Sequence, residues 1–174
     1  GAGGGGGWGG GGGGGGEDGR GAAESGGGGA GSGDTYGGAG AGILGNAVIT
    51  EELSKIDMGI GLNVVAACFG CESIFQYGSE EQKKKWLPPV CAGEMVSAGA
   101  FTEPNAGTDV AGYKTRAVKQ GDRYVINGNK MFITNGTVCN FMVAQCITNP
   151  DEKKHNSFSL IIVPADTPGV TRNK

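Results

Sequence analysis

The pattern of apolar and polar residues divides the chain into a helical part followed by a β part. Across residues 43–56, apolar side chains recur every three or four positions, which predicts an amphipathic helix. Residues 62–77 are more continuously apolar and predict a second, more deeply buried helix. Ser79 and Gln82 have the spacing of a capping box, so we expect a third helix to begin there. That helix should stop at Pro88-Pro89.

After Gly93, short apolar stretches alternate with turn residues, a pattern that predicts strands. The expected strands are residues 95–102, 113–119, 124–126, 130–134, 141–148 and 158–163. Because helices precede strands rather than alternating with them, the order favours an α+β fold class over repeated βαβ units. The boundary between the two parts is expected near residues 92–95.

The first 42 residues contain 26 of the 39 glycines, so they offer few side chains to a core. Two interpretations are open: a true glycine-rich segment, or residues written as glycine or alanine in place of unidentified side chains. We favour the second, and the intact mass of the segment would distinguish them. The expected domains are therefore residues 1–42 as this segment, 43–93 as a helical N-terminal domain and 94–174 as a β domain.

Charge and cysteine content exclude several classes of protein. The net charge of −3 argues against a nucleic-acid partner, because neutralising phosphates requires clustered lysine and arginine. No stretch approaches the ~18 consecutive apolar residues of a membrane span. An odd number of cysteines and no signal-like leader predict a soluble protein in a reducing compartment, the cytoplasm or the mitochondrial matrix.

Cys68 and Cys71 form a C-x-x-C pattern, which can indicate a redox pair or half of a zinc site. They lie in an apolar helical stretch without a second pair, and the only histidine, His155, lies in a polar loop. Buried packing thiols are therefore the favoured interpretation, His155 is expected to be exposed, and no metal site is expected.

Residues 101–109 form a polar segment at the end of an expected strand. Thr102 offers a hydroxyl, Pro104 sets a rigid turn, and residues 105–107 let backbone N–H groups converge on an anion. Such a segment can hold a ligand. By residue chemistry alone, an ordinary polar turn is the commoner interpretation.

Several motifs stand in an order and spacing that resemble the acyl-CoA dehydrogenase family. They are residues 36–40 (Tyr-Gly-Gly-Ala-Gly), 51–54 (Glu-Glu-Leu-Ser), 77–83 (Tyr-Gly-Ser-Glu-Glu-Gln-Lys), 102–104 (Thr-Glu-Pro) and 127–136 (Asn-Gly-Asn-Lys-Met-Phe-Ile-Thr-Asn-Gly). The resemblance implies a helical N-terminal domain followed by an antiparallel β-barrel middle domain. The family's C-terminal helical bundle is expected to be absent from this chain.

The resemblance also implies an activity. Family members use FAD to convert an acyl-CoA thioester to a trans-2-enoyl-CoA, as in fatty acid β-oxidation, and pass the electrons to an electron-transferring flavoprotein. A homotetramer is the oligomeric state that the resemblance favours. The acyl-CoA, the electron-transferring flavoprotein and further copies of the chain are therefore the expected partners, and FAD is the expected cofactor.

The same resemblance implies roles for single residues in the 101–109 segment. Phe101 and Thr102 would contact the isoalloxazine ring of the flavin. Thr108 would bind the pyrophosphate and would also lie beside the acyl-CoA substrate, and Gly107 belongs to the same cofactor-binding set.

A second set of residues belongs to the 127–136 motif. Phe132 would form a wall against the flavin, and Ile133 and Thr134 would border its ring, with the Thr134 hydroxyl near N5. Position 132 is commonly tryptophan in the family. Phenylalanine keeps an aromatic face but loses the indole N–H, which bears on the flavin potential and on partner contact.

The family's catalytic base is a carboxylate of the C-terminal domain, so no catalytic residue is expected among these 174 positions. Glu103 is not assigned as a substitute, because its family counterpart is a structural part of the Thr-Glu-Pro turn. Two alternatives stay open. The protein could be a non-catalytic subunit with a flavin fold, or an acyl-CoA oxidase or nitroalkane oxidase relative that uses oxygen.

Overall fold

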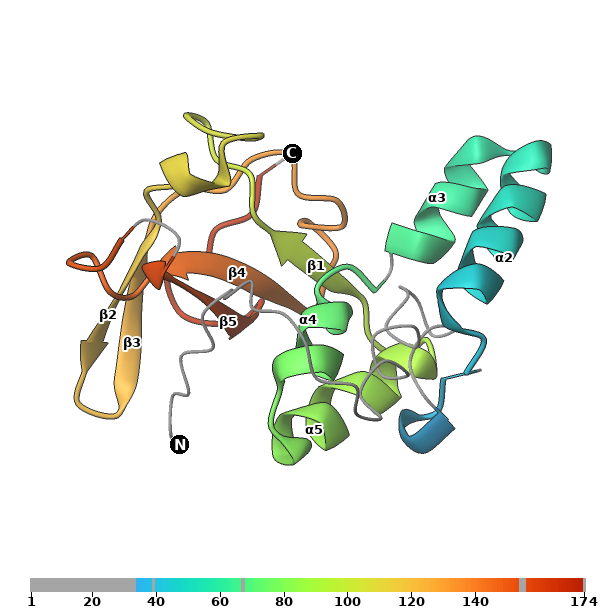
Figure 1. Cartoon of the computed structure of the whole chain (residues 1–174), viewed down its shortest axis with the longest axis horizontal. Helices are drawn as coiled ribbons and strands as arrows, with labels where there is room; N and C mark the ends of the chain where they lie inside the picture. The colour runs from blue at the N-terminus through green and yellow to red at the C-terminus, as the bar shows by residue number, and fades with distance from the viewer. Residues whose placement is uncertain (1–33, 39, 67, 154–155, 174) are drawn as a thin grey trace, which may run out of the picture. The chain divides into compact units, whose positions relative to one another are not determined.

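The computed structural model describes residues 34–38, 40–66, 68–153 and 156–173 (Figure 1). The hypothesis about the glycine-rich segment lies mostly outside these residues, as does the expectation for His155. The described chain divides into two compact units. The first contains residues 100–133 and 144–162, and the second contains residues 34–99, 134–143 and 163–173.

The helices that precede the strands belong to the second unit. They are η1 (Asp34–Tyr36), α2 (Gly42–Ile56), α3 (Met58–Ala66), α4 (Cys71–Tyr77) and α5 (Glu80–Cys91). The helix predicted at 43–56 is confirmed as α2, and α3 packs beside it (Figure 1). No helix of the described chain is long and apolar enough to cross a membrane.

The single buried helix predicted over residues 62–77 is wrong, because the chain turns between α3 and α4. Gly70 has a φ of 95°, in the left-handed region that glycine adopts readily, and it stands immediately before α4. Its amide N–H donates to the Glu72 carboxylate at 3.0 Å. A left-handed residue ends one helical path and lets the next begin in a new direction.

Helix α5 confirms the predicted start and corrects the predicted end. The Ser79 hydroxyl accepts from the Gln82 amide N–H at 3.2 Å, and the Gln82 side chain accepts from the Ser79 amide N–H at 2.8 Å. The helix then continues through Pro88 and Pro89 to Cys91. Proline lacks a donor but keeps its carbonyl, and the Pro88 carbonyl still accepts from the Ala92 amide at 2.9 Å.

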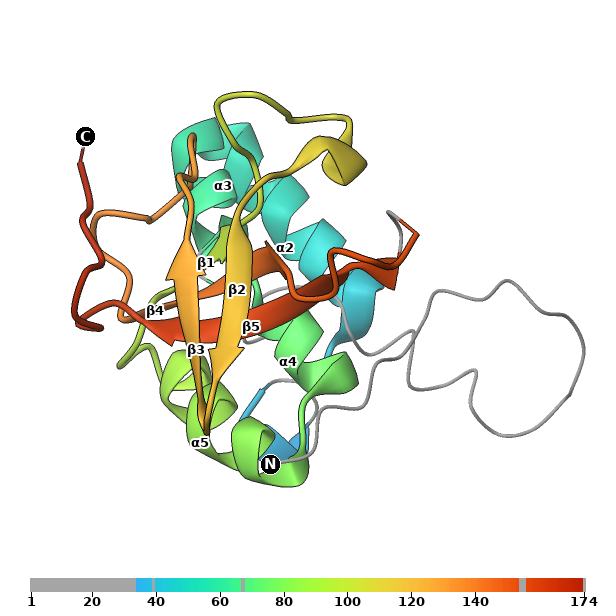
Figure 2. The same cartoon turned by 90° about the vertical axis from the view of Figure 1, so that its left-hand side faces the viewer.

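Five strands and the short helix η2 (Val110–Gly112) follow. The strands are β1 (Ser97–Ala100), β2 (Arg116–Gln120), β3 (Arg123–Asn127), β4 (Phe141–Ile147) and β5 (Phe158–Pro164). Figure 2 shows β2 and β3 as a hairpin. The strand expected at 130–134 is not formed, because Phe132 has a φ angle of 57°, which is incompatible with an extended strand. Asn135, just beyond it, also has a left-handed φ of 63°.

The α+β class is confirmed, but the expected antiparallel β-barrel is wrong for these residues. The sheet is mixed: β2 pairs antiparallel with β3 and parallel with β4, where Arg116 faces Ile147. Its strand order is β1-β4-β2-β3, with β5 paired to β4, so β3 is an open edge. A closed barrel needs an unbroken ring of strands, and the segment after β3 leaves the extended conformation at Phe132.

The core of the second unit forms where α5 meets the first half of β4 and where the start of α4 meets β1. Leu87 and Phe141 are fully buried, and the Trp86 ring lies 4.6 Å from the Phe141 ring between centroids. Cys68 and Cys71 are both buried, as expected of packing residues. The Cys71 Sγ lies 3.2 Å from the Ser97 hydroxyl oxygen, and burial raises the pKa of Cys71 to about 12.

Candidate functional site

The polar segment 101–109 begins with a tight turn in the first unit. The Glu103 amide donates to the Ala106 carbonyl at 2.9 Å, and the Ala106 amide donates back to the Glu103 carbonyl at 3.2 Å. Pro104 and Asn105 occupy the tip of this turn, which matches the rigid turn expected from Pro104. The Asn105 side-chain amide donates to the Gly112 carbonyl at 2.9 Å and closes the following loop.

Glu103 lies beneath this turn and is only 5% exposed. Its carboxylate accepts from the backbone amides of Lys114 at 2.6 Å and Thr115 at 3.0 Å, and from the Lys130 ammonium at 2.8 Å. Burial alone would raise the pKa of Glu103, but the hydrogen bonds from the Lys130 ammonium and from the backbone amides of Lys114 and Thr115 outweigh it and lower this pKa to about 2. This geometry favours the structural interpretation of Glu103 over a catalytic one.

Lys130 joins the two segments that the sequence singled out. Its ammonium donates to the Phe101 carbonyl at 2.9 Å as well as to Glu103, and it lies 4.7 Å from the centroid of the Tyr113 ring. Next to it, the Met131 amide donates to the Thr102 carbonyl at 2.8 Å. The segment 127–133 is therefore bonded directly to residues 101–103.

Several polar groups of the 101–109 segment are left available to a ligand. Among the described residues, the hydroxyls of Thr102 and Thr108 have no hydrogen-bond partner, and neither do the amides of Gly107 and Thr108. The Ala106 amide, expected to face an anion, is instead used inside the turn. Free hydroxyl and amide donors in this order suit a flavin ring edge followed by a pyrophosphate.

Phe132 and Ile133 extend the same unit. Phe132 is 86% exposed and has a left-handed backbone, which is rare for a large aromatic residue. Such strain is retained where the surrounding structure or a function requires it. Ile133 is half-buried. Thr134 is exposed and belongs to the second unit, so its place relative to Phe101 and Thr102 stays a prediction.

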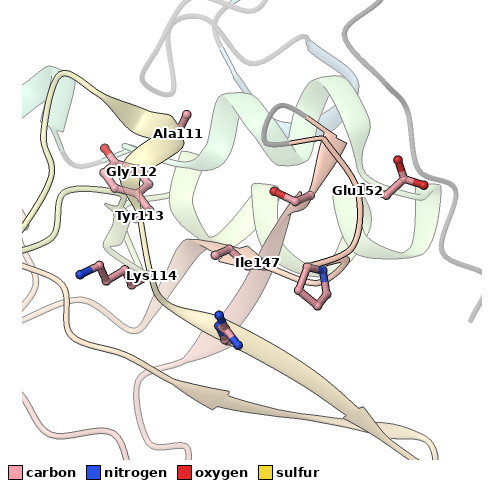
Figure 3. A pocket seen from close by; sticks show the side chains of 9 residues that line it. Ala111, Gly112, Tyr113, Lys114, Ile147 and Glu152 are labelled. Carbon is pink, nitrogen blue, oxygen red and sulfur yellow. The ribbon is translucent and has the colours of Figure 1, made fainter.

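A pocket of about 510 Å³ lies further along the chain in the first unit (Figure 3). It is lined by residues 111–114, Arg116, Ile147, Pro150, Glu152 and Ser157. The expected flavin residues are not among its lining residues. Its lining combines two cationic side chains, Lys114 and Arg116, and the carboxylate of Glu152 with apolar residues such as Ile147 and Pro150.

Sequence reasoning missed Lys130 and Tyr113, the residues that hold the segment together. Tyr113 is buried, and its hydroxyl donates to the Gly107 carbonyl at 3.1 Å. Lys130 stands in the 127–136 motif, so a signal was present: a lone lysine followed by three apolar residues implies a buried acidic partner. Glu103 was the matching carboxylate.

Comparison with known proteins places both parts of the chain in one family. Residues 19–94 match the acyl-CoA dehydrogenase N-terminal domain, and residues 98–174 match the acyl-CoA dehydrogenase middle domain. An acyl-CoA dehydrogenase of Bacillus subtilis is 37% identical over 142 residues, which are 81% of this chain and 37% of that protein.

Two solved structures show the same fold. An acyl-CoA dehydrogenase from Geobacillus kaustophilus has a TM-score of 0.69 and 45% identity, over 78% of this chain and 36% of that one. A glutaryl-CoA dehydrogenase from Mycobacterium smegmatis, solved in complex with FADH2, has a TM-score of 0.66 and 36% identity, over 75% and 32% of the two chains. The chain thus spans about a third of the length of these relatives, and it belongs to the acyl-CoA dehydrogenase family.

Proposed function

We propose that the protein is an FAD-dependent oxidoreductase that converts an acyl-CoA thioester to its trans-2-enoyl-CoA. The observation that carries this proposal is the bonding of residues 101–103 to Lys130 and Met131. It joins the two segments that the family resemblance assigns to the flavin, and it leaves the Thr102 hydroxyl without a protein partner in the described chain.

The residues present fit a flavin. Phe101 and Thr102 would hold the ring edge, the amides of Gly107 and Thr108 would bind the pyrophosphate, and Phe132 would cover one ring face. When bound, FAD would supply the acceptor for the hydride that leaves the β-carbon of the acyl group. Ile133 and Thr134 would border the ring, and Thr108 would also contact the acyl-CoA, as the family resemblance implies.

The remaining expectations come from the resemblance and from the sequence pattern. We propose an electron-transferring flavoprotein as the electron acceptor, a homotetramer as the assembly and residues 43–93 and 94–174 as the domain division. A carboxylate outside these residues would remove the α-proton, since Glu103 is buried and paired with Lys130. The cytoplasm and the mitochondrial matrix, both reducing, remain the expected locations.

Flavin binding tests the cofactor assignment directly. Titration of the protein with FAD, followed by flavin fluorescence, should show saturable binding. Phe132→Leu should weaken this binding roughly fivefold, because an aromatic stacking contact is worth about 1 kcal/mol. Tyr124→Leu removes another exposed aromatic residue of the same unit and should leave the affinity unchanged. Equal affinities of the two variants would contradict the role of Phe132.

Reduction by substrate tests the reaction. The protein expressed from its complete reading frame should lose its oxidised-flavin absorbance when butyryl-CoA is added without oxygen, and an enoyl-CoA should appear by mass spectrometry. Flavin that stays oxidised with every acyl-CoA tried would favour the non-catalytic subunit. Rapid reoxidation by air would favour the oxidase relatives.

A further inference from the structure

The peptide units that carry the amides of Thr102 and Thr108 are each anchored through their carbonyl oxygen. The Phe101 carbonyl and the Thr102 amide belong to one peptide plane, and the Gly107 carbonyl and the Thr108 amide belong to another. In a trans peptide the C=O and N–H point in opposite directions, and the described chain contains no cis peptide bond. Fixing the carbonyl therefore fixes the direction in which the amide N–H points.

Lys130 anchors the peptide plane between Phe101 and Thr102. Its ammonium donates to the Phe101 carbonyl at 2.9 Å, and the amide on the other side of that plane, Thr102, has no hydrogen-bond partner in the described chain. The side chain of Lys130 is 12% exposed and that of Glu103 is 2% exposed. Burying an ammonium costs free energy, and the Glu103 carboxylate, 2.8 Å away, offsets this cost.

Tyr113 links Lys130 to the second peptide plane. The Lys130 ammonium lies over its ring, and the Tyr113 hydroxyl donates to the Gly107 carbonyl at 3.1 Å. On the far side of that plane, the Thr108 amide has no hydrogen-bond partner in the described chain. One buried cation thus holds, directly and through one tyrosine, the peptides that present two free amides.

We propose that Lys130 is the positioning residue of the flavin site: it orients the Thr102 and Thr108 amides, the first toward the flavin ring and the second toward the pyrophosphate. Lys130 does not touch the cofactor in this arrangement. Glu103 neutralises the ammonium and ties it to the start of β2 through the Lys114 and Thr115 amides. The inference rests on the proposed function for the identity of the ligand, but the orientation of the amides is a property of the chain itself.

A pair of variants isolates the contribution of Lys130. Lys130→Met alone would leave Glu103 charged and unpaired in the interior, so the comparison uses Glu103→Gln and the double variant Glu103→Gln/Lys130→Met. Neither variant has the Glu103 carboxylate. In Glu103→Gln the amide oxygen can still accept a hydrogen bond from the Lys130 ammonium, so the two variants differ in the ammonium that binds the Phe101 carbonyl. Lys130→Arg keeps a cation at this position and serves as the conservative rescue.

Two readouts separate positioning from simple stability. With cooperative unfolding confirmed for both variants, the double variant should bind FAD at least about tenfold more weakly than Glu103→Gln, and its bound flavin should show a shifted absorption band. Lys130→Arg should retain most of the wild-type affinity. A folded double variant that binds FAD as tightly as Glu103→Gln, with an unshifted spectrum, would overturn the proposal.

Amide hydrogen exchange in the wild-type protein gives a test that needs no variant. Without FAD, the Thr102 and Thr108 amides should exchange fast, whereas the Met131 amide, bonded to the Thr102 carbonyl, should be protected. FAD should slow exchange at Thr102 and Thr108 by about tenfold or more. Binding of FAD without any change at these two amides refutes the positioning role, whereas an absence of FAD binding refutes the proposed function itself.

Discussion

At the scale of single residues, Gly70 shows how tightly the second unit is packed. A Cβ added there would lie 2.9 Å from Val143 Cγ2 and 3.1 Å from the Ala98 carbonyl oxygen. The left-handed φ of 95° adds the backbone strain that any side chain would suffer. Steric conflict and strain therefore act together at this position.

Gly70→Ala should lower the free energy of unfolding by roughly 2–4 kcal/mol, since overpacking and left-handed strain add. Gly93→Ala is the matched control: its φ of 74° is also left-handed, but no atom lies within 4 Å of the added Cβ. That variant should lose only ~1–2 kcal/mol. Urea denaturation of both proteins measures the difference, and equal losses would show that packing against Val143 contributes nothing.

The sequence identified the residues expected to face a ligand better than the residues that hold the 101–109 segment in place. Thr102 and Thr108 were named, and their hydroxyls are free in the described chain. Lys130 and Tyr113 were not named, because the carbonyls that they bind lie 29 and 6 residues away in sequence. The local pattern around Lys130 indicates an acidic partner but does not identify the Phe101 carbonyl. The left-handed backbone of Phe132 was equally hidden, since its neighbours resemble those of a strand.

At the scale of elements, local hydrogen-bond chemistry determines where helices begin more reliably than where they end. The capping box at the start of α5 was readable from the spacing of Ser79 and Gln82 alone. The end of α5 was not predicted correctly, because Pro88 and Pro89 lie in its last turn. Their carbonyls there still accept hydrogen bonds from the amides of Ala92, Glu94 and Met95. The break between α3 and α4 was not predicted either, because it depends on the φ angle of Gly70.

Ser79→Ala should lower the free energy of unfolding by about 1 kcal/mol, because it removes the acceptor of the Gln82 amide. Ser79→Asp keeps an acceptor at the N-cap and adds a negative charge at the positive end of the helix dipole. That variant should therefore retain the wild-type stability. Thermal and urea unfolding of the two proteins test the cap, and equal stability of Ser79→Ala and Ser79→Asp would argue against it.

At the scale of the whole molecule, acid stability should depend on one buried carboxylate. The pKa of Glu103 is about 2 in the folded chain against an ordinary value of 4.5. A carboxyl group whose pKa is lowered by folding stabilises the native state above its unfolded pKa, and this stabilisation is lost as pH falls toward the folded pKa. Between these two values the loss amounts to ~3 kcal/mol at most.

The free energy of unfolding should therefore change little from this group above pH ~5 and should fall as the pH drops from ~4.5 toward ~2. Glu103→Gln should have a lower free energy of unfolding at neutral pH but a shallower decline in acid. Urea titrations at a series of pH values compare the two proteins. Parallel declines would show that Glu103 does not carry the acid sensitivity.

The fold class followed from the order of helical and strand patterns, but the topology of the sheet did not. A barrel was expected because the family resemblance implied one, whereas the parallel contact of Arg116 with Ile147 and the open edge at β3 follow from pairings distant in sequence. The alternation of apolar and polar residues predicts which residues form strands, but it does not predict which strands pair with one another.

The burial of the cysteines makes them useful reporters of motion. Cys68, Cys71, Cys139 and Cys146 are buried, and Cys91 is half-buried. A thiol reagent can modify a buried cysteine only when its surroundings open, so each alkylation rate reports a local opening equilibrium. Cys71 and Cys139 lie in the second unit and Cys146 in the first. Mass spectrometry of a timed alkylation would therefore show whether the two units open together or one at a time.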